Sequence, residues 1–519
     1  MTAIHAAVGV PIVIGVETKG VSVVADSYNL RPFLESEFRL YRERYAHSPF
    51  LVLARAASEL SPSISAAAAA CGMPVVGCGA ASNAQGLPEL RHSCHVLISI
   101  ASTHVLAAEE TGTTAPPGNP AALAATALLS DEISYFEIGS PPEMIQLVLG
   151  GAPSYAVSRD RALGANGNVP TGRTLCELAM QRTDEFNHNA AVSTNDRPLE
   201  PAPHVEPNWP RSWASNERHA TLRALYAVAD RLALSLQRKF KIAVKLIFWL
   251  ATTAAALYGS FLVFASDDMP LQQLLLVPYL LLLILAYVVF YLARRSDIHN
   301  RFVEYRALAE GLRVQCYWDA CGINQSAADY YSNRYPVDLN WIRLAIRSAT
   351  LIRPVVPDAT WPRDPVDEVL RDWIADQQRY YAQAHSHALR VEKTTNIAVR
   401  VIFGLGGCAT LAVLLQSQMS QIAPFLRHIS FLGFLCSSIA AALVALVNKL
   451  GVLYQSQDYA RMLAIYAQAR RHLENSSAGS AISIAAALGR AALSESGEWI
   501  LFRRERRIDE PASPFRKPW

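Results

Sequence analysis

The chain lacks the short motifs that mark the common nucleotide-using and metal-dependent enzymes. Its 519 residues contain no GxxxxGK[ST] phosphate loop and no GxGxxG between a predicted strand and helix. They contain neither an HExxH metal pair nor a GxSxG nucleophile. His385 and His387 are two residues apart, which places them on different faces of a helix. The sequence therefore predicts no catalytic residue and no metal ligand.

Dense charge and paired cysteines are also missing. The formal net charge is only +3, and no basic run with interleaved aromatic residues occurs, so we expect no nucleic acid partner. The eight cysteines include no CxxC pair, which favours reduced cysteine thiols, as in cytoplasmic proteins, over a set of disulfide bonds. Residues 1–16 lack the basic start of a secretory signal, so we expect the amino-terminal part to stay in the cytoplasm.

What the sequence does contain is four long uncharged stretches, grouped as two pairs. They are Leu246–Ser266 with Leu274–Ala293, and Val401–Leu415 with Ile429–Asn448. A helix needs roughly 20 apolar residues to cross the hydrocarbon core of a bilayer. The third stretch reaches that length by adding 395–399 and placing Arg400 near the membrane surface. We therefore predict four transmembrane helices in two hairpins, at about 244–266, 271–293, 396–416 and 429–448.

Basic residues flank both predicted hairpins at their open ends. They are Arg238, Lys239, Lys241, Lys245, Arg294 and Arg295 around the first hairpin, and Arg390, Lys393, Arg400 and Lys449 around the second. The first turn instead holds Asp267 and Asp268, and Arg427 in the second turn is an exception. By the positive-inside rule, the protein lies in the inner (cytoplasmic) membrane with both termini in the cytoplasm. No charged residue lies in the middle of a segment, which argues against an ion-coupled transporter.

Residues 1–190 alternate short apolar runs with helical patterns. The predicted strands are Pro11–Val16, Val21–Val24, Leu51–Leu53, Pro74–Val76, His95–Ile100 and Met144–Leu149. The predicted helices are Phe33–Tyr45, Ser63–Cys71, Ala121–Leu129 and a closing helix Leu175–Asn187. Continuous Val, Ile and Leu runs are typical of a sheet that is covered on both faces. This alternation predicts a cytosolic α/β domain of the doubly wound, Rossmann-like class.

Two proline-rich segments divide the rest of the chain. The predicted linkers are 191–215 and 351–365, so the chain is divided into an α/β domain (1–190), a first helical unit (216–350) and a second (366–519). The two helical units resemble an internal repeat, because in each an entering helix precedes the hairpin and a leaving helix follows it. The stretches FVEYRALAEGLR (302–313) and SQDYARMLAIYAQAR (456–470) occupy equivalent positions in the leaving helices. These helices either carry motion to the membrane or only bundle with each other.

Two loops of the α/β domain are candidate ligand sites, since such domains bind ligands at the carboxyl ends of their strands. The first offers Gly77, Gly79, Ser82 and Asn83 after the strand Pro74–Val76. The second offers Thr111, Gly112 and Thr113 downstream of His95–Ile100. Small residues and hydroxyls let backbone amides approach a phosphate, although a tight turn explains the same residues. Glu109 and Glu110 form either an acid–base pair or a solvated surface.

Several stretches resemble a bacterial protein family. The stretches HVLISI (95–100), TGTTA (111–115), SYAVSRD (154–160) and QRTDEFNHNA (181–190) resemble its amino-terminal SLOG-like domain. The stretches YRALAEGLRVQCYWDACGI (305–323), VDLNWIRLAIRS (337–348), YARMLAIYAQARRHLE (459–474) and ALGRAALSESGEWILFRRERRIDEP (487–511) resemble its membrane part, which is similar to a doubled SLATT-type two-helix module.

The resemblance implies a Rossmann-like domain that binds a nucleotide or nucleotide-derived signal, or a degenerate version of it, joined to a membrane effector of prokaryotic defence. Our leading hypothesis is accordingly a non-enzymatic membrane sensor or effector that forms oligomers. Two hairpins enclose too little space for a wide pore, so a pore would need several chains. One alternative is a membrane-tethered enzyme that processes a nucleotide or NAD-like molecule, with Glu110 or Asp26 facing the cleft. The other is a membrane scaffold that binds protein partners.

Overall fold

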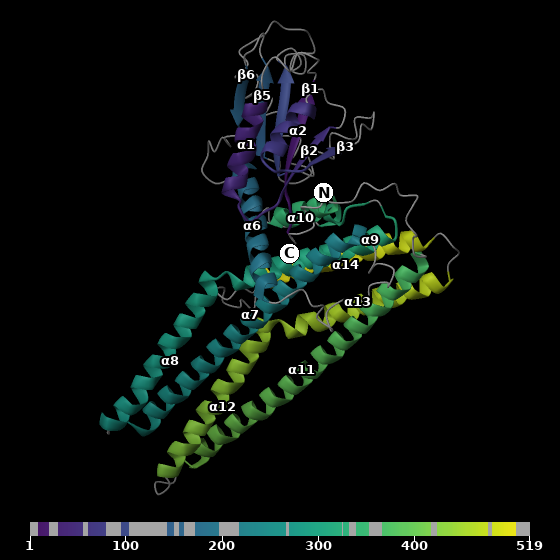
Figure 1. Ribbon diagram of the computed structural model, residues 1–519. Helices are drawn as coiled ribbons and strands as arrows, with labels where there is room; N and C mark the ends of the chain where they lie inside the picture. Colours follow the sequence, from purple (N-terminus) through teal and green to yellow (C-terminus); the bar gives the residue numbers. More distant parts are fainter. Residues whose placement is uncertain are drawn as a thin grey trace, which may run out of the picture. The chain divides into compact units, whose positions relative to one another are not determined.

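The structure, a computed structural model, is mostly helical and also contains one sheet (Figure 1). It describes residues 9–19, 30–55, 61–78, 95–102, 143–149, 155–159, 172–196, 217–265, 269–323, 325–331, 339–351, 366–416, 423–475 and 480–504. The chain divides into two compact units. Unit 1 comprises Met1–Leu232, Ala307–Asp364 and Gly489–Gly497, and unit 2 comprises Ala233–Arg306, Pro365–Leu488 and Glu498–Trp519.

Unit 1 contains a six-stranded sheet with the strand order β3-β2-β1-β4-β5-β6. The strands are β1 (Ile12–Lys19), β2 (Phe50–Arg55), β3 (Val75–Cys78), β4 (Val96–Ser102), β5 (Glu143–Leu149) and β6 (Tyr155–Arg159). Neighbouring strands are parallel from β3 to β5, and β6 is antiparallel to β5. Five of the six predicted strands are thus confirmed as β1 to β5, and β6 is an edge strand that the sequence analysis did not predict.

Alternate side chains of the central strands enter two separate cores. On one face, Ile12, Ile14 and Val96 pack with Leu34 and Phe38 of α1 (Leu30–Arg44) in a buried cluster that also includes residues of α2 (Ser61–Ala70). On the other face, a smaller cluster contains Val13, Leu51, Leu53 and Leu97, with Leu351 packed against it. Both faces are apolar because a parallel sheet is covered on both sides, which explains the uninterrupted Val, Ile and Leu runs.

Helix α6 (Gly172–Asp196) closes the sheet through polar side chains on its buried face. The amide of Asn187 accepts from Val10 N at 2.7 Å and donates to Val10 O at 2.8 Å, so it bonds the main chain just before β1 as a neighbouring strand would. Asp184 accepts from His47 N and Ser48 Oγ, both at 2.9 Å, just before β2. These two residues of the QRTDEFNHNA stretch therefore hold the amino-terminal ends of two strands.

Unit 2 is built from long helices and parts of long helices. The helices are α7 (Glu217–Phe264), α8 (Met269–Arg295), α9 (Ile298–Ala320), α11 (Val366–Gln416), α12 (Ala423–Leu450), α13 (Val452–Asn475) and α14 (Ala481–Arg504). Helices α7, α9 and α14 each contribute residues to both units. In Figure 1, α11 and α12 run side by side, and a Cβ on Gly406 of α11 would lie 3.3 Å from Cys436 Cβ of α12.

Among the residues that the structure describes, four helices are long and apolar enough to span a membrane, which confirms that part of the prediction. They belong to α7, α8, α11 and α12, and at most 17% of the most apolar window of each is buried. Large side chains such as Leu274 (69% exposed) and Val277 (57% exposed) are exposed at the surface. In water this exposed apolar surface would be unfavourable by about 25 cal/mol per Å², whereas lipid covers it without that cost.

Two runs of three consecutive helices, α7–α9 and α11–α13, match in length and in the position of the residue that separates the second helix from the third. We call these runs the first and second helical series, and each separating residue a break. Helices α7, α8 and α9 have 48, 27 and 23 residues, and α11, α12 and α13 have 51, 28 and 24. Asp297 separates α8 from α9 with φ +48°, and Gly451 separates α12 from α13 with φ +69°. Tyr305 and Tyr459 each lie eight residues after these breaks, which keeps the two predicted tyrosine stretches in register.

Several predicted boundaries differ from those of the structure. Helix α6 continues to Asp196, so the predicted linker beginning at 191 is helical over its first residues. From Gly172 onward, the first proline is Pro198, so no proline interrupts the helical hydrogen bonds before Asp196. The predicted strand Val21–Val24 and helix Ala121–Leu129 lie outside the described residues.

Candidate functional site

The first loop predicted to bind a ligand begins later than expected. Gly77 lies within β3, where it pairs with Ala54 of β2, because the strand continues to Cys78. The other predicted ligand residues, namely Gly79, Ser82, Asn83, Thr111, Gly112 and Thr113, lie outside the described residues, as do Asp26, Glu109 and Glu110. A ligand site formed by these residues therefore stays a prediction.

The strand order distinguishes the two loops. Strands β1 and β4 are neighbours, and the chain continues from β1 to β2 on one side and from β4 to β5 on the other. In open α/β sheets, ligands bind outside the carboxyl ends of the strands where the order reverses in this way. These ends are Lys19 and Ser102, and Thr111–Gly112–Thr113 follows Ser102 in the chain, whereas Gly79 follows the edge strand β3. The topology therefore favours the threonine loop.

His95, at the opposite end of β4, is structural. It is fully buried, its Nδ1 accepts a hydrogen bond from Val13 N at 3.2 Å, and its own amide donates to Val13 O at 2.8 Å. Burial lowers the pKa of His95 to about 3, because the charged imidazolium would lose its hydration. His95 is therefore neutral at physiological pH and joins β1 to β4. Among the described residues, no group of His, Cys, Asp and Glu has an arrangement that could hold a metal ion.

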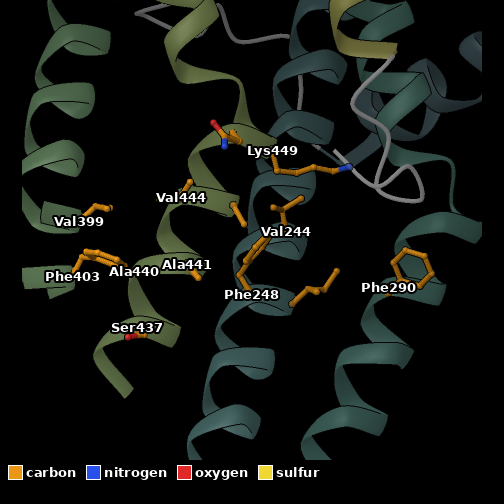
Figure 2. Close-up of a pocket in the computed structure, with 13 residues that line it drawn as sticks. Val244, Phe248, Phe290, Val399, Phe403, Ser437, Ala440, Ala441, Val444 and Lys449 are labelled. Carbon is orange, nitrogen blue, oxygen red and sulfur yellow. The ribbon is translucent and has the colours of Figure 1, made fainter. Parts of the chain in front are cut away.

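Unit 2 contains a cavity of about 750 Å³ between its membrane-length helices (Figure 2). It is lined by Val244, Ile247 and Phe248 of α7, Phe290 of α8, Val399 and Phe403 of α11, and Ser437, Ala440, Ala441, Val444, Ala445, Asn448 and Lys449 of α12. In Figure 2, Lys449 lies at one end and Ser437 near the other. The cavity is therefore apolar along its length and cationic at one end.

The last turn of α14 contacts both of the breaks in the helical series. The guanidinium of Arg503 donates from Nη1 to Leu450 O at 3.0 Å, directly before Gly451. The main-chain oxygen of Arg503 lies 2.8 Å from Nε2 of His299, two residues after Asp297. Helix carbonyls at a carboxyl terminus carry partial negative charge and attract cations. One residue of α14 therefore connects the end of α12 with the start of α9, and we call this arrangement the α14 bridge.

Buried charge and aromatic rings surround the α14 bridge. Arg504 Nη2 lies 3.4 Å from Glu304 Oε1, with side-chain exposures of 8% and 2%. Trp499 packs edge-to-face on Phe302 at a ring distance of 5.6 Å, and the Arg503 guanidinium lies 5.6 Å above the Trp499 ring. Breaking a buried ion pair leaves an uncompensated charge, which costs about 3–5 kcal/mol. The geometry is therefore held strongly in one arrangement.

The second helical series places a different acid at the equivalent position. Asp458 lies seven residues after Gly451, as Glu304 lies seven residues after Asp297. Burial raises the pKa of Asp458, Arg461 opposes this change and Glu498 adds to it. Arg461 forms an ion pair with Glu498 at 3.0 Å, but both side chains are 48% exposed. The acid of α9 thus pairs with a buried arginine, whereas that of α13 lies in a more open setting.

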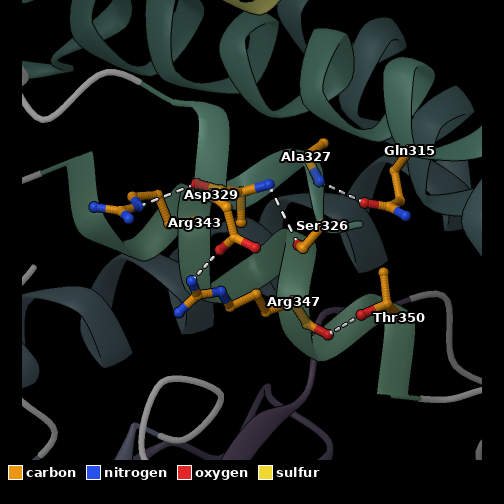
Figure 3. Close-up of polar contacts among 8 residues, drawn as sticks. Gln315, Ser326, Ala327, Asp329, Arg343, Arg347 and Thr350 are labelled. Atoms are coloured by element: carbon orange, nitrogen blue, oxygen red, sulfur yellow. Dashed lines mark hydrogen bonds and ion pairs between the residues drawn. The ribbon is translucent and has the colours of Figure 1, made fainter. Parts of the chain in front are cut away.

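Unit 1 contains a second polar network, which fixes the segment between α9 and α10 (Asn340–Leu351) (Figure 3). Gln315 Oε1 accepts from Ala327 N at 2.8 Å, at the start of the short helix η3 (Ala327–Tyr330). Arg343 Nε donates to Ala328 O at 3.2 Å, and Arg347 forms an ion pair with Asp329. These hydrogen bonds and this ion pair join residues that are close in the chain, and together they hold α10 in place.

The residues of the α14 bridge were missed by sequence reasoning, although 487–511 contributed to the family resemblance. The only sequence signal there is the pair of arginines at the end of an apolar helix. No protein-family model, curated protein or solved structure matches this chain. The fold defines a membrane protein with four membrane-length helices and a mainly parallel sheet, and its geometry is the basis for the function proposed next.

Proposed function

We propose that the chain is an integral membrane sensor and effector, in which a cytosolic, Rossmann-like domain controls a four-helix membrane module. The observation that carries this proposal is the α14 bridge. Arg503 is bonded to the end of one membrane-length helix, α12, and to the start of α9, which follows another, α8. A displacement of α14 along its axis would change both breaks at once. Effector function requires an element with two arrangements, and we propose that α14 is this element, with the observed arrangement as one of the two.

The strand order supports a ligand as the input. The reversal between β1 and β4 is where nucleotides bind in doubly wound sheets, and the resemblance of 95–100 and 111–115 to SLOG-like domains agrees with it. We propose a nucleotide-derived signal at the carboxyl ends of these strands, with Thr111, Gly112 and Thr113 as ligands. Helix α14 contributes 489–497 to unit 1 and 481–488 with 498–504 to unit 2.

The membrane module supports an output. We propose that α7 with α8 and α11 with α12 form two hairpins of SLATT type in the inner membrane, with both termini in the cytoplasm. Arg294, Arg295 and Lys449 at the ends of α8 and α12 favour this orientation. Four helices enclose too little space for a wide pore, so several copies would form it. Release of small solutes through such an oligomer fits a role in prokaryotic defence.

Release of a trapped dye from liposomes tests the proposal. The full chain is placed in POPG/POPC liposomes that contain carboxyfluorescein, and pools of cellular nucleotides are added after a thermal-shift screen has identified those that bind. We expect dye release that depends on a binding pool and is lost when Arg503 is replaced by Gln. Arg470→Gln, which removes an exposed arginine of α13, should leave the release unchanged.

If no pool shifts the melting temperature and none releases dye, the sensor and effector proposal is wrong. A thermal shift without release would instead indicate a ligand-binding scaffold. Equal dye release by the wild type and by Arg503→Gln would support effector function but would show that the α14 bridge takes no part in it.

A further inference from the structure

One face of α7 combines cations with large apolar side chains where the uncharged stretch of the helix begins. The residues of this face follow one another at spacings of three or four, which places them on the same side of a helix. They are all exposed, and they are Arg238, Lys239, Ile242, Lys245 and Trp249. Ile242 is 64% exposed and Trp249 is 63% exposed. We call these five residues the α7 stripe.

The positive charge of the α7 stripe is not balanced by the part of the chain that the structure describes. Residues 231–264 contain neither Asp nor Glu. Among the described residues, the side chains of Arg238, Lys239 and Lys245 take part in no ion pair and no hydrogen bond. Like charges on one helix face repel each other, and an anion that lies against them removes this repulsion. The α7 stripe therefore attracts an anionic partner.

The position of the α7 stripe along the helix matches the headgroup layer of a bilayer. A 20-residue segment that ends with α7 at Phe264 begins at Lys245 and is about 30 Å long, as the hydrocarbon core is thick. Arg238 lies about 10 Å before Lys245, and the headgroup layer on each side of the core is about 5–8 Å thick. Helical side chains point towards the amino terminus, so the ring of Trp249 leans back towards this layer, where tryptophan is enriched.

Helix α11 repeats this arrangement in the second helical series. Its exposed residues Arg390, Lys393, Ile397 and Arg400 are three, four and three positions apart, so they also share one helix face. Glu392 is the only acid between 386 and 416, and it forms no ion pair with another described residue. Because the pattern occurs twice, each time before an uncharged stretch, it indicates a common environment at the membrane surface.

We propose that the α7 stripe binds the headgroups of anionic phospholipids in preference to those of zwitterionic ones. Arg238 and Lys239 contact the outer part of the phosphate layer, and Lys245 extends its flexible chain into the layer from the edge of the hydrocarbon core. Each cation near a membrane surface strengthens the attraction of anionic lipid about fivefold, whereas a zwitterionic lipid has no net charge to attract. This inference rests on the proposed insertion of α7 into a membrane, but it requires no signal and no dye release.

Quenching of Trp249 by brominated lipids measures which lipids surround the α7 stripe. The full chain is placed in vesicles with equal amounts of POPG and POPC, and either the POPG or the POPC carries bromine near the top of one acyl chain. The difference in fluorescence between the wild type and Trp249→Phe isolates the signal of this tryptophan. We expect brominated POPG to quench Trp249 more than brominated POPC does. Lys245→Gln should weaken this preference up to about fivefold, whereas Arg427→Gln, which removes an exposed cation near the start of α12, should not.

A salt series and a triple variant complete the test. At about 1 M salt the Debye length falls to about 3 Å, so the preference of the wild type for POPG should disappear. The triple variant, in which Arg238, Lys239 and Lys245 are replaced by Gln, should lose it at low salt and should unfold at the wild-type temperature in POPC. Equal quenching of Trp249 by the two lipids in the wild type, or an unchanged preference in the triple variant, would overturn this inference alone. No quenching by either lipid would also overturn the proposed insertion of α7 into the membrane.

Discussion

The guanidinium of Arg503 donates a hydrogen bond to the main-chain oxygen of Leu450, although the two residues are 53 positions apart in the chain. The last carbonyl groups of a helix have no partner within the helix, and at the end of α12 a charged side chain supplies one. The arginine is only 4% exposed. The end of a membrane-length helix is thus fixed by a residue of α14.

Arg503→Gln should loosen this attachment. A hydrogen bond from a charged group contributes about 1.5–3 kcal/mol, so we expect the free energy of unfolding to fall by about that amount. Thermal unfolding of the full chain in detergent, followed by circular dichroism, measures it. Hydrogen exchange should also speed up in the last turn of α14. For Arg470→Gln, whose exposed partner is Glu474, a change of only a few tenths of a kcal/mol is expected.

Gly489→Ala should destabilise unit 1, because a Cβ at this position would collide with the indole of Trp318. Trp318 is fully buried and cannot move aside, so an overpacking cost of about 1–3 kcal/mol is expected. Gly404→Ala is the matched control: nothing lies within 4 Å of its Cβ, and alanine favours a helix. Thermal unfolding of both variants should show a loss only for the first.

The double variant Gly489→Ala with Trp318→Phe gives an internal check of that explanation. Phenylalanine lacks the outer six-membered ring of tryptophan, so its smaller side chain has more room to shift from the new methyl group and the second change should recover part of the lost stability. If Gly489→Ala is as stable as the wild type, the close packing of α14 on Trp318 is wrong.

Asn187→Leu should separate α6 from the start of β1. The substitution keeps the number and branching of the side-chain heavy atoms but leaves Val10 N and Val10 O without the amide they bond. Each buried main-chain group that loses its partner costs about 1–3 kcal/mol. Limited proteolysis, which cuts the amino-terminal segment once it is released, provides the measurement. Glu185→Gln on the same helix removes only a partly exposed pair with Arg182, and a proteolysis rate equal to that of Asn187→Leu would contradict this role.

The stability of the sheet should fall as the pH is lowered from about 6.5 towards 3. The pKa of His95 is about 3 in the folded protein and 6.5 in the unfolded chain, so between these values the unfolded chain binds more protons. One such group changes the free energy of unfolding by at most about 1.4 kcal/mol per pH unit. In His95→Asn, the amide oxygen still accepts from Val13 N but does not titrate. Hydrogen exchange of β1, corrected for intrinsic rates, should therefore depend less on pH in this variant.

The parts of the fold that the sequence predicted correctly are those that depend on local composition. Five of the strands were predicted near their observed positions because continuous runs such as Leu51–Leu53 have no polar residue to break them. β6 was missed because YAVSR has only five residues and ends in two polar ones, so it contains no apolar run long enough to predict a buried strand. Helix α6 was predicted too short because a helix ends only where a cap or a proline stops it.

The candidate sites also differ in whether a local sequence pattern could predict them. A glycine-rich loop after a strand is a local pattern, and on that basis Gly77 was assigned to the loop, but pairing with Ala54 extends β3 through it. The α14 bridge and the cavity have no local pattern, because Arg503, His299 and Leu450 come from three separate helices. Only the folded chain brings these residues together.

The sequence by itself determined that four segments are too long and too apolar to remain in water, since the transfer of a 20-residue helix depends only on its own side chains. It also determined that a parallel sheet forms, because buried strands need apolar residues on both faces. The tertiary structure alone decided that α14 returns to the breaks at Asp297 and Gly451, with His299 and Arg503 in contact across 204 positions of the chain. Contacts over such distances arise from packing, which the composition of a single segment does not specify.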